Sequence, residues 1–187
     1  MVTSRVPIFD LDGTLVDSDE ALAAPFVALG VPREHVTFGH VLADECARWG
    51  LEVERYLDEY DVERVQPFPG VVEMLEGLPR WAVCSNKHPR AGRRELERLG
   101  WHPDAALFSD SFAGPKRLAP VLATLGVAPA DVVFVGDTAH DRAVAAEMGV
   151  PFGLAAWNPR VHSEDGDVVL RSPGEVLGFC RAALNGR

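Results

Sequence analysis

Two aspartates near the start of the chain have a spacing that suits chemistry. Asp10 ends an apolar run, Asp12 follows two residues later, and Gly13 and Thr14 form the turn that comes next. Residues two apart in a strand share one face, so both carboxylates point the same way if the strand geometry persists past Asp10. Two like charges held together are costly unless a cation or a shared proton relieves the repulsion. The pair therefore indicates a bound cation or a shared proton. The alternative is a strand that ends in an acidic turn.

A second acidic pair follows the apolar run at 132–135, in the sequence G-D-T-A-H-D at 136–141. Asp141 lies four residues after Asp137, so it would sit one helical turn further on and face the same region. Such a pair adds acidic oxygens beside the end of a strand. The alternative is that Asp137 only caps the helix that follows.

A hydroxyl and a lysine occupy places that suit an anion. Ser85 directly follows the predicted strand at 81–84, where its hydroxyl can bond a phosphate oxygen with help from backbone amides. Lys116 precedes a predicted helix, where a cation opposes the helix dipole by up to about 1 kcal/mol. A bound anion would reverse that effect, and broken local rules tend to mark functional sites. The alternatives are an ordinary turn at Ser85 and a solvated pair of Lys116 and Arg117.

The elements that must position these residues alternate between strand and helix. Strands are predicted over 5–9, 81–84, 105–108, 132–135, 151–155 and 168–170, and helices over 71–78, 89–99, 118–125, 139–148 and 173–184. Repeated β-α units build an α/β fold, a Rossmann-like parallel sheet with helices on both faces. The acids, Ser85 and Lys116 then lie at or beyond the carboxyl ends of strands, where open α/β sheets bind ligands.

Residues 17–69 have a different character. Apolar residues recur there at helical spacing, which predicts about three amphipathic helices with no strand among them. The sequence P-F-P-G at 67–70 closes the segment as a stiff hinge. We therefore expect a core domain of residues 1–16 and 70–187 and an all-helical cap of residues 17–69. Because both hinges flank the acids, the cap is placed to act as a lid.

Composition narrows the class of protein. The chain has 187 residues, of which 47% are apolar and 25% are charged, and this composition is typical of a soluble globular protein. Its formal net charge of -10 argues against general nucleic-acid binding. The cysteines Cys46, Cys84 and Cys180 are odd in number and lack C-x-x-C spacing, which indicates a reduced, cytoplasmic setting and no structural zinc. No secretory signal and no segment of membrane-spanning length is apparent. Either a monomer or a homodimer is compatible with the sequence.

In chain order, these four sites resemble the four motifs of the haloacid dehalogenase superfamily, and D-L-D-G-T-L at 10–15 carries the resemblance most strongly. A cap after the first motif is similar to that of the phosphoglycolate phosphatase-like branch. Two departures leave the substrate open: the cap is short for that branch, and C-S-N-K-H at 84–88 replaces the more usual threonine form of the second motif.

The resemblance implies a magnesium-dependent phosphatase for a small phosphorylated metabolite. Asp10 would be the nucleophile that forms an aspartyl-phosphate, and Asp12 would be the general acid and later the base. Mg²⁺ would be held by the carboxylates of Asp10, Asp137 and Asp141, the last directly or through water, and by the backbone carbonyl of Asp12. The residues implied to bind phosphate are Gly13, Thr14, Ser85, Asn86 and Lys116.

Other readings of the same motifs remain. Asp12 argues against dehalogenation, because a halide leaves as a stable anion and needs no acid. A sugar phosphomutase on the same scaffold, or a non-catalytic phosphate-binding protein, would carry similar motifs. A response-regulator receiver domain fits this sequence poorly, since such domains lack a helical insertion like the one predicted here. His88, His140 and His162 are interpreted as structural or exposed residues.

Overall fold

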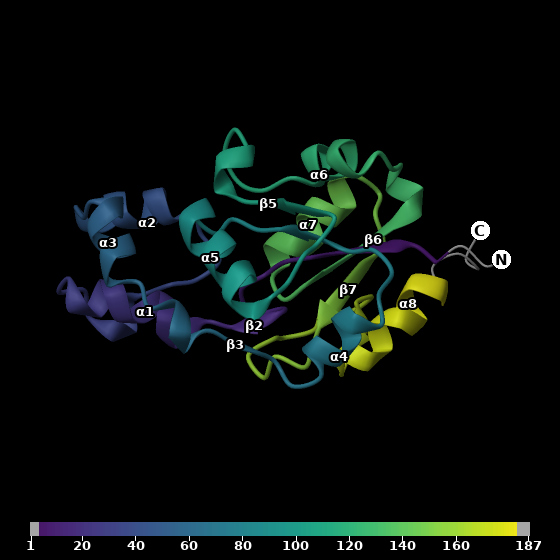
Figure 1. Cartoon of the computed structure of the whole chain (residues 1–187), viewed down its shortest axis with the longest axis horizontal. Helices are drawn as coiled ribbons and strands as arrows, with labels where there is room; N and C mark the ends of the chain where they lie inside the picture. Colours follow the sequence, from purple (N-terminus) through teal and green to yellow (C-terminus); the bar gives the residue numbers. More distant parts are fainter. Residues whose placement is uncertain (1–3, 183–187) are drawn as a thin grey trace.

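A computed structural model of the chain describes residues 4–182. Its centre is a six-stranded parallel sheet with the strand order β5-β4-β1-β6-β7-β8 (Figure 1). The strands are β1 (Val6–Phe9), β4 (Ala82–Cys84), β5 (Ala105–Leu107), β6 (Val132–Gly136), β7 (Phe152–Ala155) and β8 (Val168–Leu170). This arrangement confirms the predicted α/β class.

Alternate residues of the central strands face opposite layers of helices. Ile8 and Phe134 belong to one buried cluster, whereas Phe9 and Val135 belong to the other. The first cluster includes residues of α6 (Leu118–Leu125) and α7 (Ala139–Glu147), and the second includes residues of α4 (Val71–Glu76), α5 (Pro89–Leu99) and α8 (Val176–Ala182). Because both faces of the sheet are covered, its strands are apolar throughout.

The bounds of the elements follow the sequence pattern closely. The helices α5 and α6 have the predicted bounds, and each ends at a glycine, Gly100 and Gly126, with a positive φ of 66°. The predicted closing helix begins instead as a short 3-10 turn at Pro173–Glu175 before α8 continues it. Its last two predicted residues lie outside the described part of the chain.

The helices α1 (Asp19–Ala28), α2 (Leu42–Trp49) and α3 (Val53–Glu59) lie beyond one end of the sheet, at the left of Figure 1. We call residues 18–65 the inserted helical segment. The strands β2 (Val16–Asp17) and β3 (Gln66–Pro67) pair antiparallel where the chain leaves the core and returns. No strand was expected there, because two residues are too short for an alternating pattern and proline is unusual in strands. This pair is therefore a correction to the predicted all-helical insertion.

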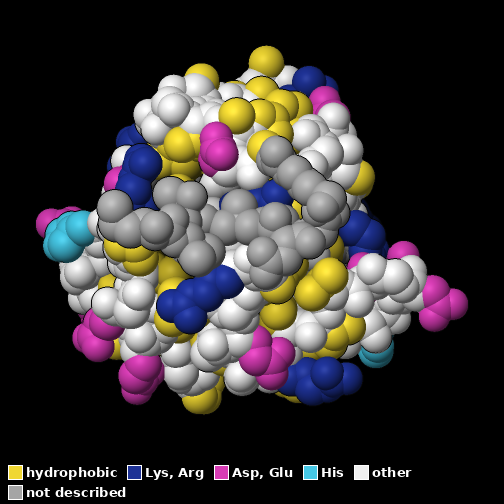
Figure 2. Space-filling view, turned by 90° about the vertical axis from the view of Figure 1, so that its right-hand side faces the viewer, with side chains coloured by type: hydrophobic (Ala, Val, Ile, Leu, Met, Phe, Trp, Pro, Cys, Tyr) yellow, Lys and Arg dark blue, Asp and Glu magenta, His cyan; other side chains and the backbone are white. Residues whose placement is uncertain are grey.

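The opposite end of the molecule faces the viewer in Figure 2. On the part of that face that the structure describes, basic and acidic side chains are interspersed with hydrophobic ones. Within residues 4–182, every helix is too short or too polar to cross a membrane.

Candidate active site

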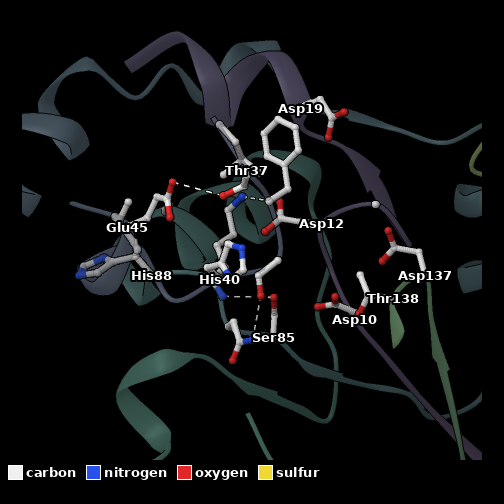
Figure 3. A pocket seen from close by; sticks show the side chains of 18 of the residues that line it. Asp10, Asp12, Asp19, Thr37, His40, Glu45, Ser85, His88, Asp137 and Thr138 are labelled. Carbon is white, nitrogen blue, oxygen red and sulfur yellow. Dashed lines mark hydrogen bonds and ion pairs between the residues drawn. The ribbon is translucent and has the colours of Figure 1, made fainter. Parts of the chain in front are cut away.

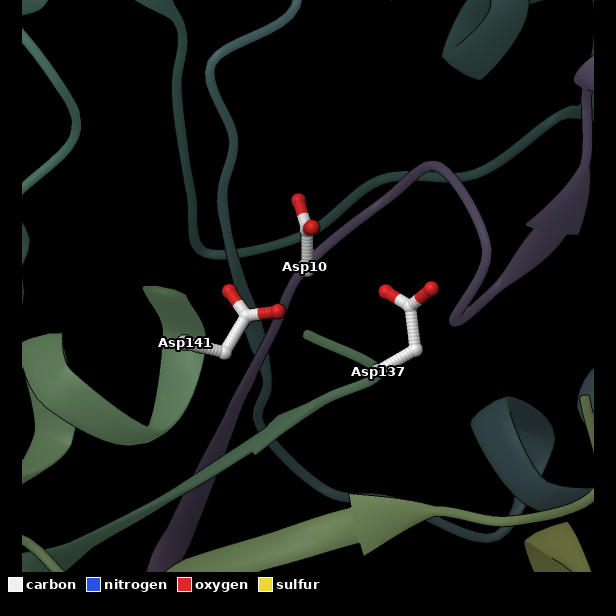
Figure 4. A group of neighbouring side chains, drawn as sticks. All are labelled: Asp10, Asp137 and Asp141. Carbon is white, nitrogen blue, oxygen red and sulfur yellow. The ribbon is translucent and has the colours of Figure 1, made fainter. Parts of the chain in front are cut away.

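Three carboxylates meet at the carboxyl end of the sheet (Figure 4). Asp10 directly follows β1, Asp137 directly follows β6, and Asp141 lies in the first turn of α7. Each offers an oxygen that lies within 4.8 Å of the oxygens of the other two. The two strands are neighbours, and the Asp10 backbone N–H donates to the Val135 carbonyl at 2.9 Å. Sheet register therefore brings together acids that lie more than a hundred positions apart.

Capping of α7 positions Asp141 and leaves Asp137 free of that role. The Thr138 backbone N–H donates to Asp141 Oδ2 at 2.9 Å, and the Asp141 backbone N–H donates to Thr138 Oγ1 at 3.2 Å. This reciprocal capping box fixes the first turn of the helix. Thr138, rather than Asp137, is the N-cap residue. The Asp137 carboxylate instead faces Asp10, and the Thr14 hydroxyl donates to it at 3.1 Å.

Burial makes the ionised forms of Asp10 and Asp137 unfavourable. Desolvation raises the pKa of Asp10 to about 6, although the Lys116 charge opposes the shift. Desolvation also raises the pKa of Asp137 to about 8, and the charges of Asp10 and Asp141 add to the increase. A cation bound among these oxygens would remove the penalty, and hard carboxylate oxygens are the ligands that Mg²⁺ prefers. The residues present therefore fit a divalent cation.

Two glycines make room for this cluster. Gly13 has a φ of +77°, and a Cβ added there would overlap the carboxylate of Asp137. A Cβ added at Gly136 would likewise overlap the carboxyl group of Asp141. Glycine is required at Gly13 for both its conformation and its close approach to the acid.

Lys116 supplies the positive charge beside the acids. Its Nζ lies 2.8 Å from Asp10 Oδ2 and 2.6 Å from Asp141 Oδ1, and its side chain is 3% exposed. Burial lowers the pKa of Lys116, but the charges of Asp10 and Asp141 outweigh burial and raise it above its ordinary value. The Asn86 side-chain oxygen accepts from the Lys116 backbone N–H at 2.7 Å. Asn86 therefore positions the lysine at the start of α6.

Asp12 belongs to a second charged network that the sequence analysis missed. Asp12 Oδ1 accepts from the Ser18 hydroxyl at 2.5 Å and from Lys87 Nζ at 2.6 Å. Lys87 Nζ also lies 2.8 Å from Glu95 Oε1, and the Tyr60 hydroxyl donates to that same oxygen. Lys87 is 2% exposed and Glu95 is fully buried. The available signal was a lysine three residues after a buried strand, with an acid on the buried face of the next helix.

The loop after β7 holds the turn that carries the first acids. The Asn158 side-chain amide donates to the Gly13 carbonyl at 2.8 Å and to Asp137 Oδ2 at 3.3 Å. The Trp157 indole N–H donates to the Thr14 carbonyl at 2.8 Å. Neither residue belongs to one of the four motifs, so the motif pattern did not single them out. Both stabilise the backbone beside the acids.

A cavity of about 300 Å³ opens over this end of the sheet (Figure 3). Asp10, Asp12 and Asp137 lie on its core side, together with Ser85 and Lys116. Gly13 and Asn86 also line the cavity, whereas Thr14 is fully buried beneath Asp137 and Asp141 lies behind Lys116. The inserted helical segment forms the opposite wall with Leu22, Phe26, Thr37, Phe38, His40, Leu42, Glu45, Tyr56 and Tyr60. The arrangement can therefore enclose a small substrate beside acids, a hydroxyl and a buried cation.

Comparison with known proteins agrees with this geometry. The chain belongs to the haloacid dehalogenase-like hydrolase family, which matches residues 5–149. A phosphoglycolate phosphatase of Xylella fastidiosa is 30% identical, over 86% of this chain and 84% of that protein. An N-acetylmuramic acid 6-phosphate phosphatase of Pseudomonas aeruginosa is 26% identical, over 96% of each chain. A solved haloacid dehalogenase-like protein of Streptococcus pneumoniae has a TM-score of 0.71 at 24% identity, covering 96% of this chain and 99% of that one.

Proposed function

We propose that this hydrolase is a magnesium-dependent phosphatase that acts on a small phosphorylated metabolite through an aspartyl-phosphate on Asp10. The observation that carries the proposal is the meeting of Asp10, Asp137 and Asp141 within 4.8 Å, beside the buried amine of Lys116. Relatives that are named phosphatases support the same reaction class. Phosphate monoester hydrolysis is very slow without catalysis, so the site must supply a large stabilisation.

Asp10 is oriented to attack phosphorus. Its Oδ1 accepts from the Leu11 backbone N–H at 2.7 Å, and its Oδ2 contacts Lys116 at 2.8 Å. In the first step a carboxylate oxygen of Asp10 bonds to phosphorus while the bond from phosphorus to the ester oxygen breaks. In the second step water attacks the phosphorus, which releases phosphate and restores the Asp10 carboxylate.

Asp12 moves the protons in both steps. In its protonated form it gives a proton to the departing ester oxygen, and it then accepts a proton from the attacking water. Ser18 and Lys87 hold its carboxylate at 2.5 Å and 2.6 Å, facing the cavity. The proton that leaves with the alcohol is therefore returned by the water that ends the cycle.

The phosphoryl group needs positive charge and hydrogen-bond donors around it. Lys116 and the Ser85 hydroxyl would bind its oxygens as charge spreads over them in the transition state. Asp10, Asp137, the Asp12 carbonyl and Asp141, directly or through water, would hold Mg²⁺. When bound, this cation neutralises the acids and the phosphoryl charge. Gly13 and Asn86 shape the loops that the phosphate would meet.

Residues 17–69 would act as the cap of this site, over a core of residues 1–16 and 70–187. The inserted helical segment forms the cavity wall opposite the acids, and the β2–β3 pair joins it to the core. Closure of such a segment would exclude bulk water from the phosphoryl group.

Hydrolysis of 4-nitrophenyl phosphate tests the proposal. The wild-type protein should turn over this ester with Mg²⁺, whereas a chelator or Asp10→Asn should abolish turnover. Asp131→Asn is the matched control, because Asp131 is an exposed carboxylate in a turn before β6. Undiminished turnover by Asp10→Asn would contradict the assignment of the nucleophile. A wild-type protein that neither hydrolyses the ester nor binds beryllium fluoride with Mg²⁺ would contradict the proposed function.

A further inference from the structure

The cavity wall opposite the acids has a chemistry that the proposed reaction does not use. Within the described part of the chain, the inserted helical segment contributes no lysine or arginine to the cavity lining. Its acidic side chains there are Asp19 and Glu45. The same segment also contributes His40, and the rest of its lining is mostly apolar, including Phe26, Phe38 and Tyr56. This wall would meet the alcohol portion of a phosphate ester, because the phosphoryl group must lie at Asp10.

The lysines and the arginine that line the cavity come from the core, and each is already paired. Lys116 contacts Asp10 and Asp141 at 2.8 and 2.6 Å. Lys87 contacts Asp12 and Glu95 at 2.6 and 2.8 Å. Arg160 forms an ion pair with Asp19. If Arg160 turned to a second anionic group on the substrate, it would leave Asp19 unpaired in the same cavity.

Two arginines of the inserted helical segment lie nearby but do not line the cavity. Arg33 lies 5.7 Å from the centroid of the Phe38 ring and pairs with Glu20 at 3.1 Å. Arg48 lies 5.3 Å from the Trp49 ring and 3.6 Å from Glu45. Both guanidinium groups are about half exposed, which weakens their effect inside the cavity.

Glu45 is the buried acid of this wall. The residue is 7% exposed, and its Oε1 accepts from the Thr37 hydroxyl and the Trp49 indole N–H, each at 3.3 Å (Figure 3). Its Oε2 has no hydrogen-bond partner among the residues that the structure describes. A negative charge held in this wall would repel an anion and attract a cation, which gives specificity by excluding the wrong partner.

We infer that this site selects phosphate monoesters whose alcohol portion is uncharged or carries an amine, and discriminates against those whose alcohol portion carries a carboxylate. The inference rests on the proposed phosphatase function. The inferred substrate preference differs from the activity for which the phosphoglycolate phosphatase relatives are named. The lining supports it through one buried carboxylate, an apolar surface and paired core cations.

Three esters of similar size test the inference, with 4-nitrophenyl phosphate as the test of the reaction itself. We would measure kcat/KM for 2-hydroxyethyl phosphate, phosphoethanolamine and 2-phosphoglycolate with the Mg²⁺-loaded protein. The first two should exceed 2-phosphoglycolate by about tenfold or more, the ratio that corresponds to a modest like-charge penalty. Equal or faster turnover of 2-phosphoglycolate would overturn the inference while leaving the phosphatase function intact. Absence of turnover of all four esters, together with no binding of beryllium fluoride with Mg²⁺, would refute that function, and the inference with it.

Two variants tie the selectivity to this wall. Glu45→Gln removes the charge and keeps an acceptor for Thr37 and Trp49, and Phe38→Arg adds a cation at a position that is 37% exposed. Either change should reduce the preference against 2-phosphoglycolate several-fold. The control is Glu34→Gln, because Glu34 is an exposed acid of the same segment that does not line the cavity. A preference that neither variant reduces, or that the control reduces equally, would overturn the assignment to this wall.

Discussion

Replacing Lys87 by methionine should destabilise the protein strongly, because the lysine joins two carboxylates away from solvent. Lys87 contacts Asp12 at 2.6 Å and Glu95 at 2.8 Å, and Glu95 is fully buried. Burial raises the pKa of Glu95 even with Lys87 beside it. Removal of one partner from a buried ion pair costs about 3–5 kcal/mol, because the remaining charge is uncompensated. That loss is a large fraction of the free energy of unfolding of a typical domain, which is roughly 5–15 kcal/mol.

A double variant separates loss of charge pairing from loss of packing. Lys87→Met with Glu95→Gln removes the buried charge, while the introduced side-chain amide keeps an oxygen that can accept from Tyr60. The double variant should therefore regain about half or more of the loss, since neutral replacements of buried pairs are often tolerated. Lower pH should also reduce the loss in Lys87→Met. A carboxyl group with a raised native pKa destabilises the fold as pH rises, and protonation of Glu95 removes that penalty.

Urea unfolding followed by tryptophan fluorescence and circular dichroism measures these differences at fixed Mg²⁺ concentration. The matched control is Arg93→Met on α5, the helix that carries Glu95, because Arg93 is 65% exposed and pairs with Asp110, which is 42% exposed. An exposed pair of this kind contributes about 0–1 kcal/mol. The reasoning is refuted if Lys87→Met loses less than about 1 kcal/mol, or if the double variant is no more stable than the single one.

Three further changes test the carboxylate cluster and its supports. With a chelator present, the melting temperature should decrease as the pH rises from 5 to 8. The native pKa values of about 6 for Asp10 and about 8 for Asp137 make the folded state bind more protons than the unfolded chain over this range. Mg²⁺ should therefore raise the melting temperature more at pH 8 than at pH 5, and an equal increase at both would contradict the cluster as its site. Gly13→Ala should abolish turnover and destabilise the fold, measured by steady-state kinetics and urea unfolding, since its Cβ meets Asp137 at a φ of +77°. Asn158→Ala should lower the free energy of unfolding by about 1–3 kcal/mol, because the Gly13 carbonyl loses a buried hydrogen-bond donor. Unchanged stability would show that this contact is unimportant.

Much of the architecture could be predicted because its signals are local. Each of these signals is contained in a short stretch of sequence. Examples are the apolar run of β6, the glycines that follow α5 and α6, and the helical spacing of apolar residues in 17–69. The first and fourth acidic motifs follow β1 and β6 directly, and neighbouring parallel strands bring their ends together. The cluster of Asp10, Asp137 and Asp141 therefore agrees with the sequence pattern.

The missed features depend on contacts between distant positions. Lys87 and Asp12 are 75 positions apart, Tyr60 and Glu95 are 35 apart, and Asn158 and Gly13 are 145 apart. No periodicity or turn rule encodes such pairs. The strands β2 and β3 escaped detection for a different reason, because each has only two residues.

The sequence by itself determined the family-like motifs, the order of strands and helices, and the residues at the strand ends, because helix and strand periodicity and turn chemistry are properties of neighbouring residues. Only the tertiary structure decided that Lys87 is buried between Asp12 and Glu95, and that the wall facing the acids is mostly apolar with Glu45 as its buried acid. Burial and pairing depend on which surfaces meet after the chain has folded. Those two quantities determine the free energy of a charge, and with it the expected choice of substrate.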